Sequence, residues 1–291
     1  MTIIRGTDNS EPLTGSVDGD LMNGFGGDDV MKGLAGSDNM NGDAGNDRLF
    51  GGDGNDLLDG GLDGTAIDDK FAPDTDLLDG GAGIDTASYS QVQHLLTVNL
   101  LQGIAIGKGN VDTLVSIENV TGTNFNDSLV GDGGANGMQG ADGNDFIDGG
   151  AGNDRLSGGG GNDTLKGNVG DDVLIGSAGA DKLDGGGGAD VFKYFSAKDS
   201  GVGATLRDVI TDFVHGTDKI DLNAIDAKAG LGGNQDFSFI GSKGFSAEGQ
   251  VRVVTEGDHT VVQLNTTGLG GADSEIQLTG HITLSSADFI A

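Results

Sequence analysis

Glycine recurs every nine residues through two long stretches of this chain. One series runs from Gly6 to Gly51 and the other from Gly122 to Gly185, fourteen glycines in all. Five residues after each glycine stands an acid in thirteen cases, and seven residues after each stands a large apolar residue in every case. Glycine is only 58 of 291 residues, so composition does not produce this shared phase. The chain therefore carries a nonapeptide repeat, which residues 149–157 illustrate well.

Each nonapeptide divides into a six-residue turn and a three-residue strand. In the turn, glycine lets the backbone adopt positive φ and lets carbonyl groups converge on an ion. In the strand, the middle residue points inward and its neighbours point outward, as expected for Leu58 and Leu156. Two nonapeptides make one coil, so each turn stacks on the turn two repeats later. The pattern predicts an all-β fold, a parallel β-roll or β-helix that binds calcium.

The aspartates of the turns are the candidate metal ligands. Calcium suits them because it accepts about six to eight oxygen ligands in loose geometry, whereas magnesium requires a tighter octahedron. We expect roughly ten or more Ca²⁺ ions, each held between stacked turns by carboxylates and turn carbonyls. The candidate ligands are Asp20, Asp29, Asp38, Asp47, Asp56, Asp76, Asp85, Asp127, Asp145, Asp154, Asp163, Asp172, Asp181 and Asp190. The pairs expected to share an ion are Asp29 with Asp47, Asp38 with Asp56, Asp145 with Asp163, Asp154 with Asp172, Asp163 with Asp181, and Asp172 with Asp190.

A disordered linker rich in glycine and aspartate is the alternative structure for such a composition. A linker has no reason to keep an apolar residue in phase with its glycines, which argues against this alternative. Without calcium, however, we expect disorder, because stacked carboxylates repel and three-residue strands bury little. Asn136 is neutral at a ligand position and predicts a weak or empty site, while Glu11 beside Pro12 is expected to cap the roll.

Charge and composition narrow the partners. The net charge is −31, and no basic patch is available for nucleic acid, so a nucleic-acid partner is not expected. The chain has no cysteine, so it has neither disulfides nor thiolate metal sites, and bound metal is expected to supply the stability instead. The sequence predicts no signal peptide and no transmembrane segment, because it lacks an apolar run of the required kind.

Changes in the repeat phase predict four regions. A first roll block covers residues 1–88 with a loop insertion at about 62–75, bridging β-helical coils cover 89–121, a second roll block covers 122–193, and a C-terminal β cap domain covers 194–291. The cap is expected to cover the end of the roll, as terminal repeats require. Its alternating segments, which predict antiparallel strands, are 250–254, 260–264 and 274–279.

These motifs resemble those of known secreted proteins. The nonapeptides resemble the repeats-in-toxin (RTX) calcium-binding proteins that Gram-negative bacteria export, and the tail resembles the C-terminal domain of serralysin-type proteins. The matching tail segments are 190–192, 208–213, 216–222, 245–246, 249–252 and 275–280. The last four residues, 288–291, resemble the acidic and apolar terminus of type I secretion substrates. The resemblance implies calcium binding, a type I secretion exporter as partner, and a secreted, extracellular location.

Catalytic motifs of the enzymes that carry such repeats are missing from the sequence. Neither a His-Glu-x-x-His zinc motif nor a Gly-x-Ser-x-Gly nucleophile motif occurs, so no enzymatic activity is expected. We therefore expect a secreted, non-enzymatic calcium-binding protein that folds on extracellular calcium. Its expected partners are an extracellular polysaccharide or a host surface. The alternative is a calcium-binding module associated with a polysaccharide-modifying enzyme system. Direct membrane action is disfavoured because no amphipathic or spanning segment is present.

Overall fold

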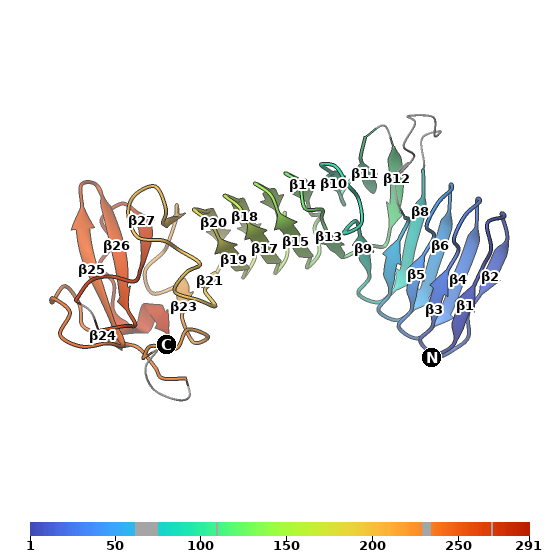
Figure 1. Ribbon diagram of the computed structural model, residues 1–291. Coiled ribbons are helices and arrows are strands. Elements are labelled where there is room, and N and C mark those ends of the chain that lie inside the picture. Colours follow the sequence, from blue (N-terminus) through green and yellow to red (C-terminus); the bar gives the residue numbers. More distant parts are fainter. Residues whose placement is uncertain (62–74, 109, 229–233, 269) are drawn as a thin grey trace. The chain divides into compact units, whose positions relative to one another are not determined.

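The computed structural model describes residues 1–61, 75–108, 110–228, 234–268 and 270–291 (Figure 1). The chain forms two compact units, residues 1–141 and 142–291. Both units are built from β-strands, and the only helix among the described residues is one 3-10 turn, η1 (Ser286–Asp288). No helix in the described ranges is long and apolar enough to cross a bilayer. The predicted loop at 62–75 falls almost wholly outside the described residues, and the four predicted regions remain a prediction.

Unit 1 consists of two sheets of short strands that face each other as the two sides of a roll. The strands of the first sheet, in spatial order, are β1 (Ile3–Arg5), β3 (Leu21–Asn23), β5 (Asn39–Asn41), β7 (Leu57–Asp59), β9 (Thr86–Ser88), β13 (Asn119–Thr121) and β15 (Gly137–Asp142). Those of the second are β2 (Pro12–Thr14), β4 (Val30–Ala35), β6 (Arg48–Asp53), β8 (Leu77–Ala82), β12 (Val111–Val115), β11 (Ile104–Ile106), β10 (Thr97–Asn99) and β14 (Ser128–Val130). Consecutive strands alternate between the sheets, as a roll requires, except at β10, β11 and β12, which all lie in the second sheet.

Residues paired in the parallel strands of the repeats are eighteen residues apart, which is the length of one coil. Met22 pairs with Met40 on one sheet, and Met31 pairs with Leu49 on the other. All four side chains are fully buried. The apolar residue of each three-residue strand therefore fills the interior, and its neighbours face outward, as the repeat predicts. Each coil buries few apolar atoms of its own, so the core forms only when coils stack.

The bridging segment interrupts the parallel pattern. β10 and β11 pair antiparallel, as do β11 and β12, so a meander is inserted where a single strand would otherwise continue the roll. On either side of the meander the roll resumes, because β12 pairs parallel with β8 and β10 pairs parallel with β14. The strands here have three to five residues and are no longer than those of the repeats.

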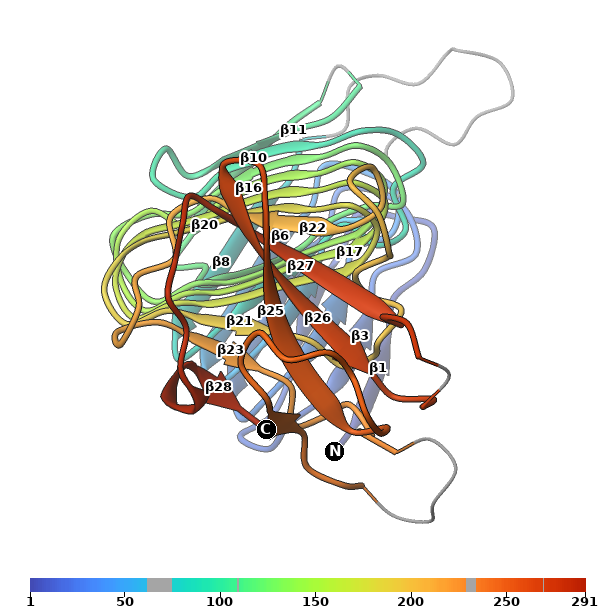
Figure 2. The same cartoon turned by 90° about the vertical axis from the view of Figure 1, so that its left-hand side faces the viewer.

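Unit 2 continues the same construction and then changes it. Its first sheet contains β17 (Arg155–Gly160), β19 (Val173–Ala178), β21 (Val191–Lys193), β23 (Lys219–Asp221) and β28 (Phe289–Ile290). Its second contains β16 (Phe146–Asp148), β18 (Thr164–Val169), β20 (Lys182–Gly187), β22 (Asp208–Ile210), β27 (Ser274–Thr279), β26 (His259–Asn265), β25 (Gln250–Glu256) and β24 (Ser238–Phe239). Strands β25, β26 and β27 are antiparallel and appear orange to red in Figure 2, which confirms the three strands predicted from alternation.

Strand β27 joins the two constructions of unit 2. On one side it pairs antiparallel with β26, and on the other it pairs parallel with β22, the last strand of the roll in this sheet. The antiparallel strands therefore extend the roll's own sheet. This pairing covers an edge that would otherwise expose unpaired backbone groups.

Candidate calcium sites

The turn aspartates form hydrogen-bonded ladders between stacked coils. The backbone N–H of Asp38 donates to Oδ1 of Asp56 at 2.8 Å, and that of Asp163 donates to Oδ1 of Asp181 at 2.8 Å. All six predicted pairs are brought together in this way, at 2.7 to 3.0 Å. The ladders of unit 1 run Glu11–Asp29–Asp47–Asp76–Asp112 and Asp20–Asp38–Asp56–Asp85–Glu118. Those of unit 2 run Asp145–Asp163–Asp181–Asp208 and Asp154–Asp172–Asp190–Asp218.

The second carboxylate oxygen of many ladder residues is buried and has no hydrogen-bond partner. These oxygens belong to residues that are at most 2% exposed. They are Oδ2 of Asp29, Asp38, Asp56, Asp85, Asp163, Asp172, Asp181 and Asp208. A buried carboxylate oxygen without a partner is costly and rare, and a row of ionised carboxylates in register would be stabilised by a compensating positive charge. The donor set is hard oxygen, which is the set that calcium prefers.

Burial makes several of these carboxylates weak acids in the absence of a cation. Desolvation raises the pKa of Asp163 and Asp181 to about 6, and neighbouring acids add to the effect. Asp56 and Asp190 also have pKa values raised to about 6 for the same leading reason. For Asp208 the pKa is raised to about 8, first by burial and then by the charge of Asp181. A bound cation would reverse this balance, because it favours the ionised carboxylate.

Backbone conformation separates the turns into two kinds. In most turns the second residue has a positive φ even where it is not glycine, as at Leu34 (82°), Asn168 (70°) and Ser177 (71°). We call these open turns; in those that begin at Gly33, Gly167 and Gly176 the aspartate Oδ2 has no hydrogen-bond partner. A positive φ costs a non-glycine residue about 1 to 3 kcal/mol and persists where function or packing imposes it.

The glycines of the open turns are required by close approach. A Cβ at Gly33, the first residue of its turn, would overlap Oδ2 of Asp38, because the carboxylate folds back over this position. A Cβ at Gly170, the fourth residue of its turn, would overlap the carbonyl oxygen of Gly152 in the neighbouring coil. Stacked open turns therefore pack backbone against backbone, which brings carbonyl oxygens and carboxylates into one place.

Closed turns are those that begin at Gly6, Gly15, Gly122 and Gly131, and their second residue does not have a positive φ. In the turn at Gly15, Oδ2 of Asp20 accepts hydrogen bonds from the backbone N–H and the hydroxyl of Ser16. In the turn at Gly122, the carboxylate of Asp127 accepts the backbone N–H and the hydroxyl of Thr123.

Asp20 and Asp127 were predicted as ligands on equal terms with the rest, but their carboxylates are engaged by their own turns. The sequence contains the reason, since the fourth residue of these turns is Asp18 or Phe125 and not glycine. The closed turn at Gly131 also holds Asn136, whose side-chain oxygen accepts the backbone N–H of Asp132 at 2.9 Å.

Four ladder acids lie outside the candidates that the sequence pattern provided. Asp112 and Glu118 follow Asp76 and Asp85 in the ladders of unit 1, and Asp208 and Asp218 end those of unit 2. None of them belongs to an unbroken nonapeptide. Each is nevertheless followed two residues later by a buried apolar residue, which is the acid and core spacing of the repeat. A search for this triplet alone would have found all four.

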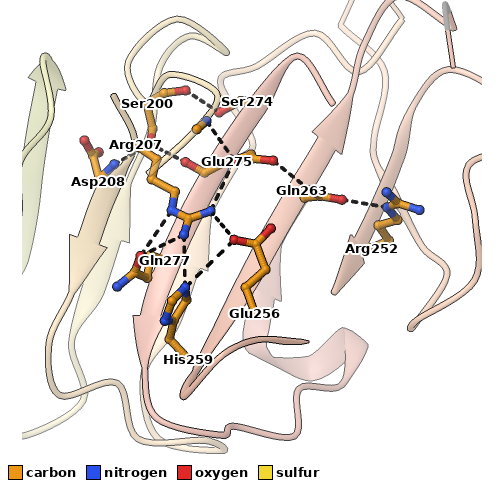
Figure 3. Close-up of polar contacts among 11 residues, drawn as sticks. Ser200, Arg207, Asp208, Arg252, Glu256, His259, Gln263, Ser274, Glu275 and Gln277 are labelled. Atoms are coloured by element: carbon orange, nitrogen blue, oxygen red, sulfur yellow. Dashed lines mark hydrogen bonds and ion pairs between the residues drawn. The ribbon is translucent and has the colours of Figure 1, made fainter. Parts of the chain in front are cut away.

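Asp208, at the end of its ladder, is anchored within unit 2 by Ser200. The backbone N–H of Asp208 donates to the Ser200 hydroxyl at 2.8 Å, and this hydroxyl donates in turn to the Glu275 carbonyl (Figure 3). The Ser274 hydroxyl donates to the Ser200 carbonyl at 2.9 Å. The final acid of the ladder is therefore connected to β27 through Ser200.

Arg207, beside Asp208, also connects the end of the ladder to the antiparallel strands, in this case through its charge. Its guanidinium is buried and reaches Glu275 at 3.3 Å, Glu256 at 3.0 Å and Gln277 at 2.9 Å (Figure 3). It also lies 3.1 Å from Nε2 of His259. A buried guanidinium with this many partners fixes the loop before β22 against the antiparallel strands.

Each candidate site is poor in side-chain ligands. Within the described residues, no group of three or more histidines, cysteines or acids is arranged to hold a metal. A cation bound here would therefore be held by one or two carboxylates together with backbone carbonyls. This combination fits a large hard cation and does not fit zinc or other metals that require imidazole or thiolate.

The fold and the turns define a class of protein, the parallel β-roll of calcium-binding nonapeptide repeats. A family model of the RTX calcium-binding nonapeptide repeat matches residues 5–40 and 32–64. The model described as Peptidase M10 serralysin C terminal matches residues 77–291, which is most of the chain. The chain belongs to this serralysin C-terminal family, and its RTX repeats are of the type that binds calcium.

Solved structures of RTX proteins are similar to parts of the chain. Subunit AlgE6R3 of the Azotobacter vinelandii mannuronan C5-epimerase is 28% identical, with a TM-score of 0.34, over 57% of this chain and 79% of that one. Subunit AlgE6R2 is 25% identical, with a TM-score of 0.35, over 58% and 90%. The extracellular lipase LipA of Serratia marcescens is 16% identical, with a TM-score of 0.30, over 98% of this chain, which spans only 39% of the lipase chain. No curated protein matches the chain.

Proposed function

We propose that this chain is a secreted, non-enzymatic calcium-binding protein whose roll folds when calcium fills its open turns. The observation that carries the proposal is the set of buried carboxylate oxygens without partners, which recur at successive rungs in both units, as at Asp38 and Asp56 and at Asp163 and Asp181. The proposed ligands are Asp29, Asp38, Asp47, Asp56, Asp76, Asp85, Asp145, Asp154, Asp163, Asp172, Asp181 and Asp190, to which we add Asp208 and Asp218. Asp20 and Asp127 are left out because their own turns occupy them.

Calcium supplies positive charge and oxygen coordination between stacked turns. The residues of the chain position these ligands. The ladder hydrogen bonds, from the backbone N–H of one aspartate to Oδ1 of the next, orient the carboxylates, and the core residues hold the coils one pitch apart. Without neutralisation, burial of the carboxylates opposes folding, as the raised pKa values of Asp163 and Asp181 indicate. Calcium-binding free energy therefore becomes folding free energy.

The proposed location follows from the same coupling. Free calcium in the cytosol is too low to fill sites of extracellular grade, with Kd on the order of 10⁻⁴ to 10⁻³ M, so the chain would remain unfolded inside the cell. It would leave through a type I exporter in this unfolded form and fold outside. The family to which the chain belongs supports this route. Outside, we propose that it acts at a surface, in a matrix or in contact with a host.

The test is a calcium titration of the purified chain followed by circular dichroism and isothermal calorimetry. We expect a largely disordered chain in chelator, a cooperative gain of β-structure with calcium, and several ions bound per chain. Magnesium at the same concentration serves as the control and is expected to fail. A chain that is fully folded in chelator, and that gains no ions on titration, would refute the proposal.

A further inference from the structure

Unit 1 contains a pocket that lies outside the open turns proposed as calcium sites. Its volume is about 720 Å³, within the size range of small-ligand sites, about 300 to 1,000 Å³. Three short segments form its walls: the loop before β10, the loop after β11, and the closed turn at Gly122. The lining residues are Gln93, His94, Leu95, Gly107, Lys108, Asn124, Phe125 and Asn126.

The closed turn forms one wall because it is not built as a calcium turn. Its third, fourth and fifth residues are Asn124, Phe125 and Asn126, where an open turn has a glycine at the fourth position. The Thr123 hydroxyl accepts the N–H of Phe125 at 3.0 Å and donates to Asp127 at 3.0 Å. These bonds hold the turn in shape without a metal ion, and Asn124, Phe125 and Asn126 line the pocket.

The other two walls are tied to this turn. The backbone N–H of Leu96 donates to Oδ1 of Asp127 at 2.7 Å, in the place that a ladder aspartate takes elsewhere. The antiparallel register of β10 and β11 pairs Thr97 with Ile106, which sets Gly107 and Lys108 beside the residues before β10. The pocket is therefore a preformed consequence of the inserted meander.

The chemistry of the lining differs from that of the rest of the chain. No acidic side chain is among the lining residues, although acids outnumber lysine and arginine 46 to 15 in the whole sequence. Lys108 and His94 provide a cation and an imidazole, and Gln93, Asn124 and Asn126 provide carboxamides that both donate and accept. Phe125 and Leu95 add half-exposed apolar surface, 41% and 60% exposed.

We propose that this pocket binds an acidic saccharide, namely a short run of sugar residues that carry carboxylates. Lys108 pairs with a carboxylate, the carboxamides bind hydroxyl groups, and Phe125 packs against an apolar ring face. The proposal names a ligand for the surface or matrix role and so rests on the proposed function. The two proposals are also linked by electrostatics, because the net charge of −31 repels any anion until bound calcium reduces the magnitude of that charge.

The experiment uses the full chain, loaded with calcium and then freed of excess, with tri-galacturonate as the probe and maltotriose as the neutral control. Binding is measured by calorimetry, and circular dichroism of the same samples reports folding. We expect tri-galacturonate to bind and maltotriose to bind much more weakly. Lys108→Met is expected to weaken binding about tenfold, the loss of one charge-assisted hydrogen bond. Lys243→Met, at an exposed lysine far along the chain, is the matched control and is expected to bind as the parent does.

Further variants address the apolar wall and the fold. Phe125→Ala is expected to weaken binding severalfold, whereas Phe195→Ala, at a phenylalanine of similar exposure in unit 2 (48% against 41%), is expected to have no effect. Equal affinity for the two saccharides, or equal losses in Lys108→Met and Lys243→Met, would overturn the pocket proposal. So would a chain that folds with calcium yet ignores tri-galacturonate, and this result would leave the proposed function standing. A chain that folds and binds tri-galacturonate equally in chelator would refute the calcium-dependent function while supporting the pocket.

Discussion

Open and closed turns share their length, their first glycine and their buried core residue, yet they differ in the hydrogen bonding of the aspartate at the sixth position. In the open turn at Gly33, Asp38 keeps a buried oxygen without a partner. In the closed turn at Gly15, Asp20 receives the N–H and the hydroxyl of Ser16. A closed turn satisfies its own carboxylate, whereas the open turn leaves one buried carboxylate oxygen for the cation that we propose. The difference shows that the coils stack whether or not the turn satisfies its own aspartate.

The largest effect in this comparison is expected when a methyl group is added at the fourth position of a turn. Gly170→Ala places a Cβ against the carbonyl oxygen of Gly152 at a φ of 147°, so we expect a loss of about 3 kcal/mol or more in calcium. Gly134→Ala changes the same position of a closed turn, where a Cβ meets only the Asp132 side chain at 3.4 Å, and it should be nearly neutral. Chemical unfolding in calcium measures both, and equal losses would contradict the division into two kinds of turn.

Lowering the pH should have opposite effects on the contributions that open-turn and closed-turn aspartates make to folding stability. In chelator, the pKa of Asp163 is about 6 in the folded chain against an ordinary 3.8, so folding gains from protonation. This contribution is complete below about 3.8 and is lost as pH rises through about 6, so β-structure in chelator should increase from pH 7 to pH 5.

With limiting calcium the same protonation competes with the ion, so calcium affinity should fall over that pH interval. The contrast is Asp20 in its closed turn. Burial alone raises its pKa, but hydrogen bonds from Thr2 and Ser16 outweigh this effect and lower it, so its contribution to stability is lost only as pH falls below the ordinary value. Circular dichroism and calcium titration across pH measure both effects. A chelated chain that loses β-structure from pH 7 to pH 5 would contradict the expectation for open turns.

Neutralising one aspartate should distinguish the turns by calcium affinity. Asp172→Asn retains an oxygen that can accept the N–H of Asp154 but removes a buried charge from an open turn, so we expect the calcium midpoint to rise about tenfold. Asp127→Asn in the closed turn should change the midpoint by less than about twofold, since this carboxylate is bound by Thr123. A calcium titration decides, and a reversed order would remove the reason for leaving Asp127 out of the proposed ligands.

The smallest expected effect concerns the second residue of each turn. Leu34→Gly relieves a φ of 82° and should stabilise the calcium-loaded chain by about 1 kcal/mol. Ser16→Gly removes the hydroxyl that serves Asp20 and should destabilise it by about 1 kcal/mol. Thermal unfolding in calcium resolves the two signs, and destabilisation by Leu34→Gly would argue against strain in the open turn.

The roll itself was predictable because its cause is periodic. The spacing of Leu49 and Met31 placed both in the core, and the eighteen-residue register followed from the repeat. The four ladder acids outside the repeats do not follow from the whole nonapeptide, because they keep only its acid and core spacing. The pocket could not be predicted, because it depends on Leu96 meeting Asp127 across 31 residues.

The state of some turns also depends on more than local sequence. Glycine at the fourth position separates most open turns from closed ones, and Asp18 and Phe125 give the expected outcome. Gly134 is an exception, because its turn is closed although its fourth residue is glycine. The neutral Asn136 at the ligand position accompanies this exception, so the acid and the glycine are needed together.

The ladder tolerates interruption in a way that has a practical consequence. Asp47 pairs with Asp76 across 29 residues, Asp76 with Asp112 across 36, and Asp181 with Asp208 across 27, in place of the usual 18. Sequence can thus be added between one rung and the next while the rungs keep their hydrogen bonds. The roll can accept new loops, and each such insertion lies next to a rung of the ladder. Binding functions could be gained, lost or engineered there without redesign of the fold.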